Sequence, residues 1–167
     1  QLKIMKNIVI AAGYATRLGE LTKNFPKPLL KIGENTILGR MLDDIDRIPE
    51  IDEHIIITNH KFAPIFAQWA KDQGQINSDQ GQRELVKGET TSDLRPQTSD
   101  RRWVKPITIV DDGTETNDTR LGAVCDLLFA MDKLHIDDDL LVVAADNLLF
   151  FSFQEFVDFA KEKQTSY

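Results

Sequence analysis

The sequence predicts an α/β fold, a Rossmann-like, mostly parallel sheet with helices on both faces. Two observations support this prediction. Short apolar runs alternate along the chain with longer amphipathic stretches of helical period, a pattern that builds parallel sheets with right-handed crossovers. Within these runs, polar and apolar residues do not alternate, which is typical of strands that are buried on both faces of a sheet.

Four apolar runs have the length of strands. The first ends at Gly13 and the last ends at Asp146. Ligands of parallel sheets bind beyond the carboxyl ends of the strands, so these two residues are candidates for one shared site. The four predicted strands are residues 6–12, 54–58, 107–110 and 140–145.

Four stretches repeat apolar side chains at helical spacing. Thr36 is expected to cap the first, and Ser152 with Glu155 forms a capping box ahead of the last. Cys125 falls among the apolar positions of the third and is expected in the core. The clustered Phe residues from Phe150 onward are interpreted as packing residues. The predicted helices are residues 37–48, 62–70, 121–129 and 153–160.

Length and composition predict one domain over residues 1–167, since 41% of the residues are hydrophobic. A polar stretch at about 74–105 interrupts the pattern as a lid, an inserted hairpin or a partly disordered excursion. No apolar run reaches the ~20 residues of a membrane span, and the first residues resemble no signal peptide. With a single cysteine, a cytoplasmic location is expected.

Charge is distributed unevenly along the chain. The net charge of −7 argues against a nucleic-acid partner. Residues 1–40, however, contain seven Lys or Arg and two Glu, which gives +5 and leaves −12 for the rest. A basic segment in an acidic chain indicates a small anion, such as a phosphate, bound at one place.

The segment from Ala11 to Leu29 has the ingredients of a polyphosphate site. Gly13 permits close approach of the backbone to an anion. Arg17 offers a planar set of donors for phosphate oxygens, and Lys27 is a point charge held between two prolines. It is not a dinucleotide fingerprint, because Ala15 stands at the second glycine, and the chain has no Walker A motif.

This segment resembles the N-terminal signature of the sugar-phosphate nucleotidyltransferases, the nucleoside-diphosphate-sugar pyrophosphorylases. The pattern is A-A-G-x-[GA]-[ST]-R-L-x-x-L-T-x-x-x-P-K-[PA]-L, and the match over residues 11–29 is nearly complete. Glu20 departs from it, standing where proline is common. Further resemblance lies at residues 37–38, 55–61, 112–114, 120–123 and 143–147.

The resemblance implies transfer of a nucleoside monophosphate from a nucleoside triphosphate to a sugar 1-phosphate, with release of pyrophosphate. Arg17 and Lys27 would be catalytic, neutralising phosphate charge. Asp146 would bind Mg²⁺, and Gly122 would approach the base edge. The implied nucleotide-binding residues are Ala11, Ala12, Gly13, Tyr14, Ala15, Thr16, Arg17, Lys27 and Gly122.

Several alternatives stay open at this point. Chains of the resembled family continue well past the position of Asp146, and this chain has one predicted helix after it. The acceptor could therefore be a non-sugar phosphate such as phosphocholine. The chain could also be a fragment of such a protein, or a catalytically incomplete nucleotide-binding regulatory module. Association between copies as a homo-oligomer is also open.

Overall fold

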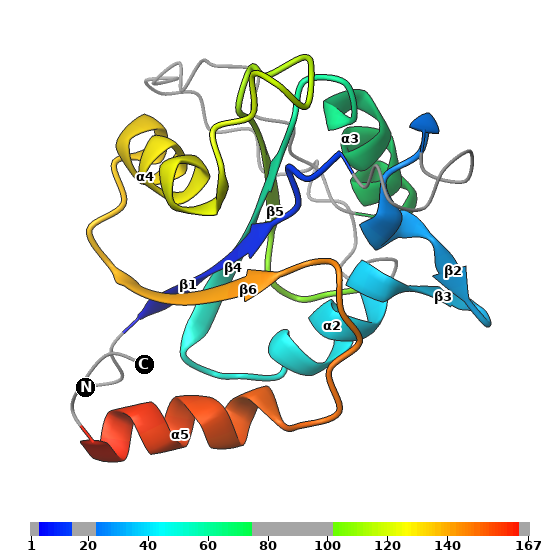
Figure 1. Ribbon diagram of the computed structural model, residues 1–167. Helices are drawn as coiled ribbons and strands as arrows, with labels where there is room; N and C mark the ends of the chain where they lie inside the picture. The colour runs from blue at the N-terminus through cyan, green and yellow to red at the C-terminus, as the bar shows by residue number, and fades with distance from the viewer. Residues whose placement is uncertain (1–3, 15–22, 75–101, 164–167) are drawn as a thin grey trace, which may run out of the picture.

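The computed structural model describes residues 4–14, 23–74 and 102–163. Across these residues the central feature is a four-stranded sheet in the order β5-β4-β1-β6 (Figure 1). All three neighbouring pairs are parallel, which confirms the predicted sheet. Its strands are β1 (Met5–Ile10), β4 (Ile51–Thr58), β5 (Ile107–Asp111) and β6 (Asp139–Ala144).

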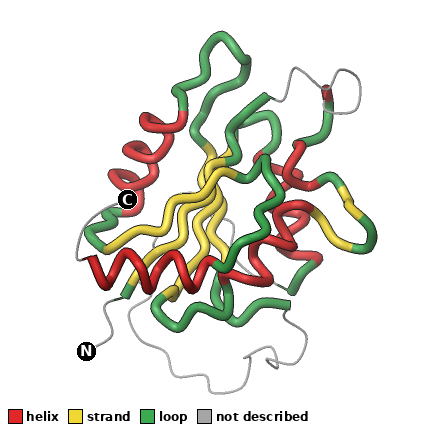
Figure 2. The backbone as a smooth tube through the Cα atoms, turned by 60° about the horizontal axis from the view of Figure 1, so that its bottom comes forward, coloured by secondary structure: helices red, strands yellow, loops and turns green. Residues whose placement is uncertain are grey.

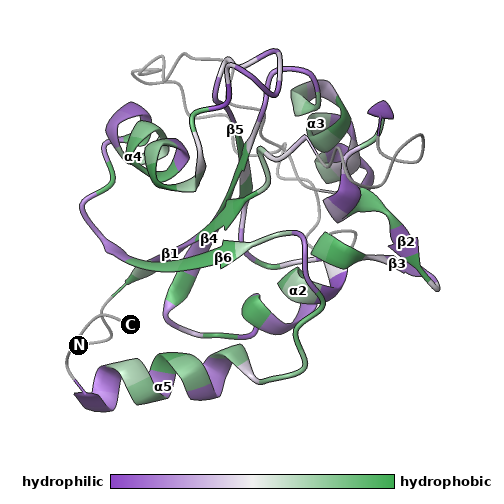
Figure 3. Ribbon diagram, viewed as in Figure 1, coloured by the Kyte–Doolittle hydropathy of each residue, from purple (hydrophilic) through white to green (hydrophobic). Residues whose placement is uncertain are grey.

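Helices cover both faces of the sheet, as predicted. α2 (Ile37–Ile45), α3 (Ala63–Asp72) and α5 (Phe153–Lys163) pack on one face, and α4 (Ala123–Leu134) packs on the other (Figures 1 and 2). Side chains alternate between the two cores: Val9 joins the first, and Ile8 joins the second. Two covered faces explain the continuous apolar runs at residues 8–10 of β1 and 55–57 of β4 (Figure 3).

Two helix starts agree with the capping residues expected from the sequence. The Thr36 hydroxyl accepts a hydrogen bond from the Gly39 N–H at 2.9 Å, and α2 begins at the next residue. The Ser152 hydroxyl accepts from the Glu155 N–H at 3.3 Å ahead of α5. Each cap satisfies a backbone donor that the first turn of a helix leaves without a partner. α2 ends at Ile45, earlier than the apolar spacing predicted.

Three short elements precede α2 in the described part of the chain. A short 3-10 helix, η2 (Lys27–Leu29), leads into a hairpin of β2 (Lys31–Ile32) and β3 (Asn35–Thr36). Gly33 takes a φ of +68° in the turn between the two strands, a conformation that favours glycine. Strands of two residues are too short to show periodicity in a sequence.

The prediction for the buried side of α4 was wrong. Val124, Cys125 and Leu128 are exposed, whereas Asp126 and Ala130 are buried. Leu127, Met131 and Leu134 pack toward the sheet with Ala130, so the inward face is rotated from the expected one. α4 has apolar side chains on both sides, and the sequence alone did not show which side meets the sheet.

The Phe-rich segment also differs from the prediction of packing residues. Phe153 is buried, but Phe150 is 94% exposed. Phe151, Phe156 and Phe159 are exposed to lesser degrees.

Most of the predicted polar insertion, residues 75–101, lies outside the described residues. Where the description resumes, the Arg102 N–H donates to the Gln73 carbonyl at 3.2 Å, so the two ends of the segment adjoin. Trp103 is buried, its ring packs at a tilt of 44° against the ring of Trp69, and its indole N–H donates to Asp43 at 3.0 Å. In the described ranges, no helix combines the length and apolar character needed to cross a membrane.

Candidate functional site

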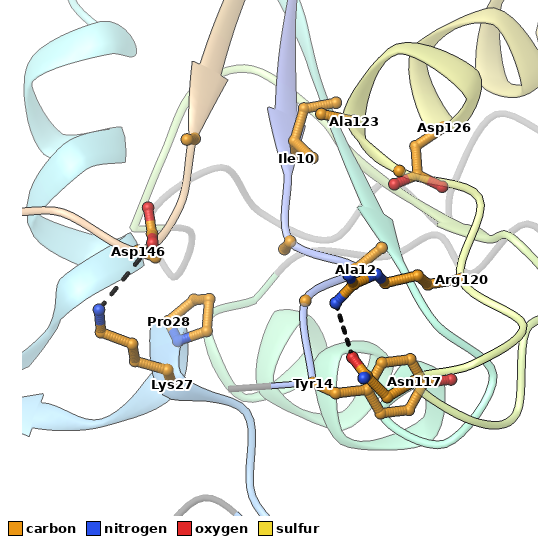
Figure 4. A pocket seen from close by; sticks show the side chains of 14 residues that line it. Ile10, Ala12, Tyr14, Lys27, Pro28, Asn117, Arg120, Ala123, Asp126 and Asp146 are labelled. Atoms are coloured by element: carbon orange, nitrogen blue, oxygen red, sulfur yellow. Dashed lines mark hydrogen bonds and ion pairs between the residues drawn. The ribbon is translucent and has the colours of Figure 1, made fainter. Parts of the chain in front are cut away.

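A cavity of about 560 Å³ opens beyond the carboxyl ends of β1 and β6 (Figure 4). This is where the sequence placed a shared site, because parallel strands end at one edge of the sheet. Its walls come from the segments after β1 and β6, η2, and the start of α4. The lining residues are Ile10, Ala11, Ala12, Gly13, Tyr14, Lys27, Pro28, Asn117, Arg120, Gly122, Ala123, Asp126, Ala144 and Asp146.

The structure brings most of the sequence-predicted site residues to this cavity. Those that line it are Ala11, Ala12, Gly13, Tyr14, Lys27, Gly122 and Asp146. Ala15, Thr16 and Arg17 lie outside the described residues.

The loop after β1 is fixed by hydrogen bonds to the neighbouring strand ends. The Ala11 N–H donates to the Ile57 carbonyl at 2.8 Å, and the Ala12 carbonyl accepts from the buried Asn59 amide at 3.1 Å. The Tyr14 hydroxyl donates to the Thr114 carbonyl at 2.9 Å. A Cβ added at Gly13 would meet no atom within 4 Å, so its bare backbone borders open space. Such a backbone can approach a ligand closely.

Lys27 is held in place by its neighbours. Pro28 and Leu29 are buried, and the N–H groups of Leu29 and Leu30 donate back to Pro26 and Lys27 at 3.1 and 3.0 Å. The backbone of Lys27 is therefore anchored while its ammonium remains partly exposed. A positioned cation at a cavity neutralises charge that develops on a bound anion.

Asp146 faces Lys27 across the cavity. Lys27 Nζ lies 4.0 Å from Asp146 Oδ2, and 58% of the Asp146 side chain is exposed. The preceding residue, Ala145, is buried and donates to the Ile10 carbonyl at 3.1 Å, which holds the strand end beside β1. The other Asp146 oxygen accepts from the Asn147 amide at 2.8 Å. The carboxylate thus has capacity for a further ligand.

The residues present fit Mg²⁺ better than an ion that needs a protein cage. Among the described residues, no three His, Cys, Asp or Glu side chains form a cluster that could hold a metal. Mg²⁺ commonly keeps several waters and binds through one or two carboxylates together with substrate phosphates. Asp146, partly exposed at a cavity, suits that mode of binding.

The N-terminus of α4 also borders the cavity. Gly122 stands at the N-cap with a φ of +87°, and its carbonyl accepts from the Asp126 N–H at 2.9 Å. A side chain at this position would be strained, so the glycine is required by the backbone conformation. The result is an unblocked backbone at the cavity wall.

Sequence reasoning gave no role to three polar residues that line the cavity. Arg120 donates to the Asn117 side-chain oxygen at 2.9 Å, and both follow the β5 strand end. The third residue, Asp126, lies on the first turn of α4. The resemblance at residues 120–123 was a signal for Arg120, but nothing in the sequence showed that Asp126 faces inward.

Asp126 and Asp112 form a buried carboxyl pair. Asp126 is 3% exposed and Asp112 is 7% exposed. Burial, reinforced by the charge and contact of Asp112, raises the pKa of Asp126 to about 6. Asp112 directly follows the end of β5, and its Oδ1 accepts from the N–H and the hydroxyl of Thr114, both at 2.7 Å.

Known proteins show the same sequence pattern and fold. The sequence model of the nucleotidyl transferase family matches residues 6–167. Over 64 residues the chain is 38% identical to the bifunctional protein GlmU of Methanococcus aeolicus. That stretch makes up 34% of this chain and 16% of the GlmU protein.

Two solved structures share the fold. A UDP-glucose pyrophosphorylase complexed with UDP-glucose aligns with a TM-score of 0.64 at 16% identity, over 96% of this chain and 55% of that one. CTP:phosphocholine cytidylyltransferase from Streptococcus pneumoniae aligns with a TM-score of 0.54 at 20% identity, over 90% of this chain and 48% of that one. The chain therefore spans about half the length of these proteins. Because the family model covers nearly the whole sequence, the chain belongs to the nucleotidyl transferase family.

Proposed function

We propose that the cavity binds a nucleoside triphosphate and that the chain transfers the nucleoside monophosphate to a sugar 1-phosphate, releasing pyrophosphate. The observation that best supports this is the convergence of Gly13, Lys27, Gly122 and Asp146 on one cavity. These residues come from four separate segments of the chain. Each belongs to a motif by which the sequence resembles the sugar-phosphate nucleotidyltransferases.

The proposed reaction needs no covalent intermediate with the protein. A phosphate oxygen of the acceptor attacks the α-phosphorus and forms the new phosphorus–oxygen bond. The bond from the α-phosphorus to the bridging oxygen of the β-phosphate breaks, and pyrophosphate leaves with that electron pair. Catalysis then consists of positioning the two phosphates and neutralising their charge.

The chain would supply three elements of this chemistry. The Gly13 backbone lets the triphosphate lie close to the loop after β1. Lys27 neutralises the α-phosphate and the incoming acceptor phosphate. Arg17, which lies outside the described residues, would hold the leaving phosphates, as the sequence resemblance implies.

Asp146 would hold Mg²⁺ together with phosphate oxygens of the nucleotide. When bound, the ion stabilises the negative charge that develops on the phosphates. The ion pair with Lys27 at 4.0 Å is partly exposed and contributes little to folding. The ammonium and the carboxylate are therefore able to separate when phosphate and metal enter.

The identity of the acceptor is inferred from the sequence resemblance and from proteins that share the fold. A sugar 1-phosphate is implied by the sequence resemblance, and UDP-glucose pyrophosphorylase shares the fold. Phosphocholine is the second candidate, because the cytidylyltransferase that acts on it also shares the fold. The cytoplasmic location and association between copies stay predictions from the sequence.

Turnover by the purified chain with Mg²⁺ tests the proposal. Each common nucleoside triphosphate is paired with a panel of sugar 1-phosphates and with phosphocholine, and pyrophosphate and the nucleoside-diphosphate product are measured. We expect product with a sugar 1-phosphate. Product formed with phosphocholine and with no sugar 1-phosphate would show that the acceptor is a non-sugar phosphate. Nucleotide binding without turnover on any acceptor would favour the regulatory module.

A further inference from the structure

A buried carboxyl group lies at the end of the cavity opposite Lys27. Asp126 is on the first turn of α4, one helical turn after Gly122, and its carboxyl lines the cavity (Figure 4). The side chain is 3% exposed. Its Oδ1 is buried with no hydrogen-bond partner among the described residues. Buried polar atoms are normally paired, so this atom needs an explanation.

Asp112 lies against Asp126, and the two carboxyls can hydrogen-bond to each other only while one of them is protonated. The Oδ1 of Asp112 is already used by Thr114, and its Oδ2 is a second buried oxygen without a partner in the described ranges. The charge of Asp112 disfavours ionisation of Asp126. When both are ionised, the pair consists entirely of hydrogen-bond acceptors.

A purely structural role does not account for this arrangement. Arg120 lines the same cavity, but its guanidinium donates to the side-chain oxygen of Asn117 at 2.9 Å. An acidic residue in the first turn of a helix gains about 0.3–1 kcal/mol from the helix dipole, and an exposed position would provide this without the cost of burial. The unsatisfied acceptor therefore points to a ligand that donates a hydrogen bond.

Charge determines which part of a nucleotide can meet this carboxyl. A triphosphate is repelled by the two acids and attracted by Lys27 at the other end of the cavity. The uncharged base is the part that can lie against α4. Cytosine, adenine and guanine carry an exocyclic amino group whose N–H donates to a carboxylate. Uracil and thymine carry no exocyclic amino group. Their one ring N–H lies between two carbonyl oxygens, and these hydrogen-bond acceptors would lie against the acceptor oxygens of the carboxylate.

We propose that Asp126, supported by Asp112, determines base specificity by accepting a hydrogen bond from the exocyclic amino group of the nucleotide base. This inference rests on the proposed function, because it needs a nucleoside triphosphate in the cavity. It selects cytosine, adenine or guanine nucleotides and rejects those of uracil and thymine.

The test is equilibrium binding of ATP, CTP, GTP, UTP and TTP to the chain at pH 8. We expect the tightest ligand to carry an exocyclic amino group and to bind at least about tenfold more tightly than UTP or TTP, because the wrong base leaves a buried acceptor unpaired. In Asp126→Ala that ratio falls to about threefold or less. Asp132→Ala, an exposed acid on the same helix, retains the original ratio.

If the Asp126→Ala variant does not fold, the same binding measurements are made with Asp126→Asn. The amide has nearly the same shape and can donate to a base carbonyl, so the ratio should still fall by at least about fivefold. Tightest binding of UTP or TTP by the original chain overturns the proposal, and so does an unchanged ratio in the variants. If no triphosphate binds at all, the proposed function fails and this inference fails with it.

Discussion

Lys27 and Asp146, far apart in the sequence, face each other across the cavity with Nζ and Oδ2 4.0 Å apart. Lys27 begins η2, and Asp146 follows the end of β6, the strand paired beside β1. An ammonium and a carboxylate from two distant segments of the chain therefore meet in the wall of one cavity. The relationship predicts separate consequences for the two side chains.

Asp146→Asn is expected to weaken the response to Mg²⁺. The amide keeps the shape of the side chain but removes the negative charge that attracts a hard cation. The Mg²⁺ concentration for half-maximal activity or nucleotide binding should rise by at least about tenfold. Asp138→Asn, in the exposed loop before β6, is the control. An unaltered Mg²⁺ titration would place the ion elsewhere.

Lys27→Ala and Arg17→Ala should each reduce triphosphate binding or turnover by at least about 10²-fold, because each removes a positioned donor to phosphate charge. The comparison is Lys31→Ala, an exposed lysine on β2 that does not line the cavity. Rates and dissociation constants are measured for all three variants. Normal values in both Lys27→Ala and Arg17→Ala would rule out the site assignment.

Asp126→Asn should stabilise the fold at neutral pH. The folded-state pKa of Asp126 is raised to about 6 from an ordinary 3.8, so the folded chain binds more protons than the unfolded chain between these values. Stability then falls as pH rises through this window. We expect a gain of about 1–3 kcal/mol in urea unfolding at pH 8, shrinking toward zero near pH 4. A variant less stable than the original at pH 8 contradicts the raised pKa.

Asp46→Asn should have the opposite effect. Burial raises the pKa of Asp46, but hydrogen bonds from buried His54 at 3.1 Å and from the N–H groups of Val104 and Lys105 outweigh it and hold the pKa below its usual value. Such a carboxylate stabilises the fold above its unfolded pKa, and the contribution disappears as pH falls through the folded pKa.

We expect Asp46→Asn to lose about 1–3 kcal/mol at pH 7 in urea unfolding, with a smaller loss below pH 4. Asp52→Asn, at a surface ion pair with Lys6, should change stability by less than about 1 kcal/mol. A loss at Asp46 that stays constant with pH would mean that packing, and not charge, is responsible.

Cys125 should react with a thiol reagent in the native state. Its side chain is exposed on α4, contrary to the sequence-based expectation of a core residue. We expect complete labelling without denaturant at a rate within about tenfold of a free thiol, because accessibility controls the reaction. If labelling requires denaturant, Cys125 is buried in the core, as the sequence predicted.

The sequence predicted the parallel sheet and the position of the candidate site. The evidence for the site was the segment from Ala11 to Leu29 and the strand ends at Gly13 and Asp146. Apolar runs without alternation correctly predicted a parallel sheet, because only a sheet covered on both faces permits them. The site at the strand ends followed from that topology. α4 shows where the reasoning failed: its apolar side chains lie on both sides, so periodicity did not decide between Cys125 and Ala130 as the inward residue.

The sequence by itself determined the alternation of strands and helices, the loop chemistry at Gly13 and Lys27, and the family resemblance. These depend on local composition and spacing, which are visible along the chain. Only the tertiary structure showed that Asp126 is buried at the cavity against Asp112, and that Lys27 meets Asp146. Burial and long-range contact depend on how distant segments pack, and the spacing of residues along one segment does not carry that information.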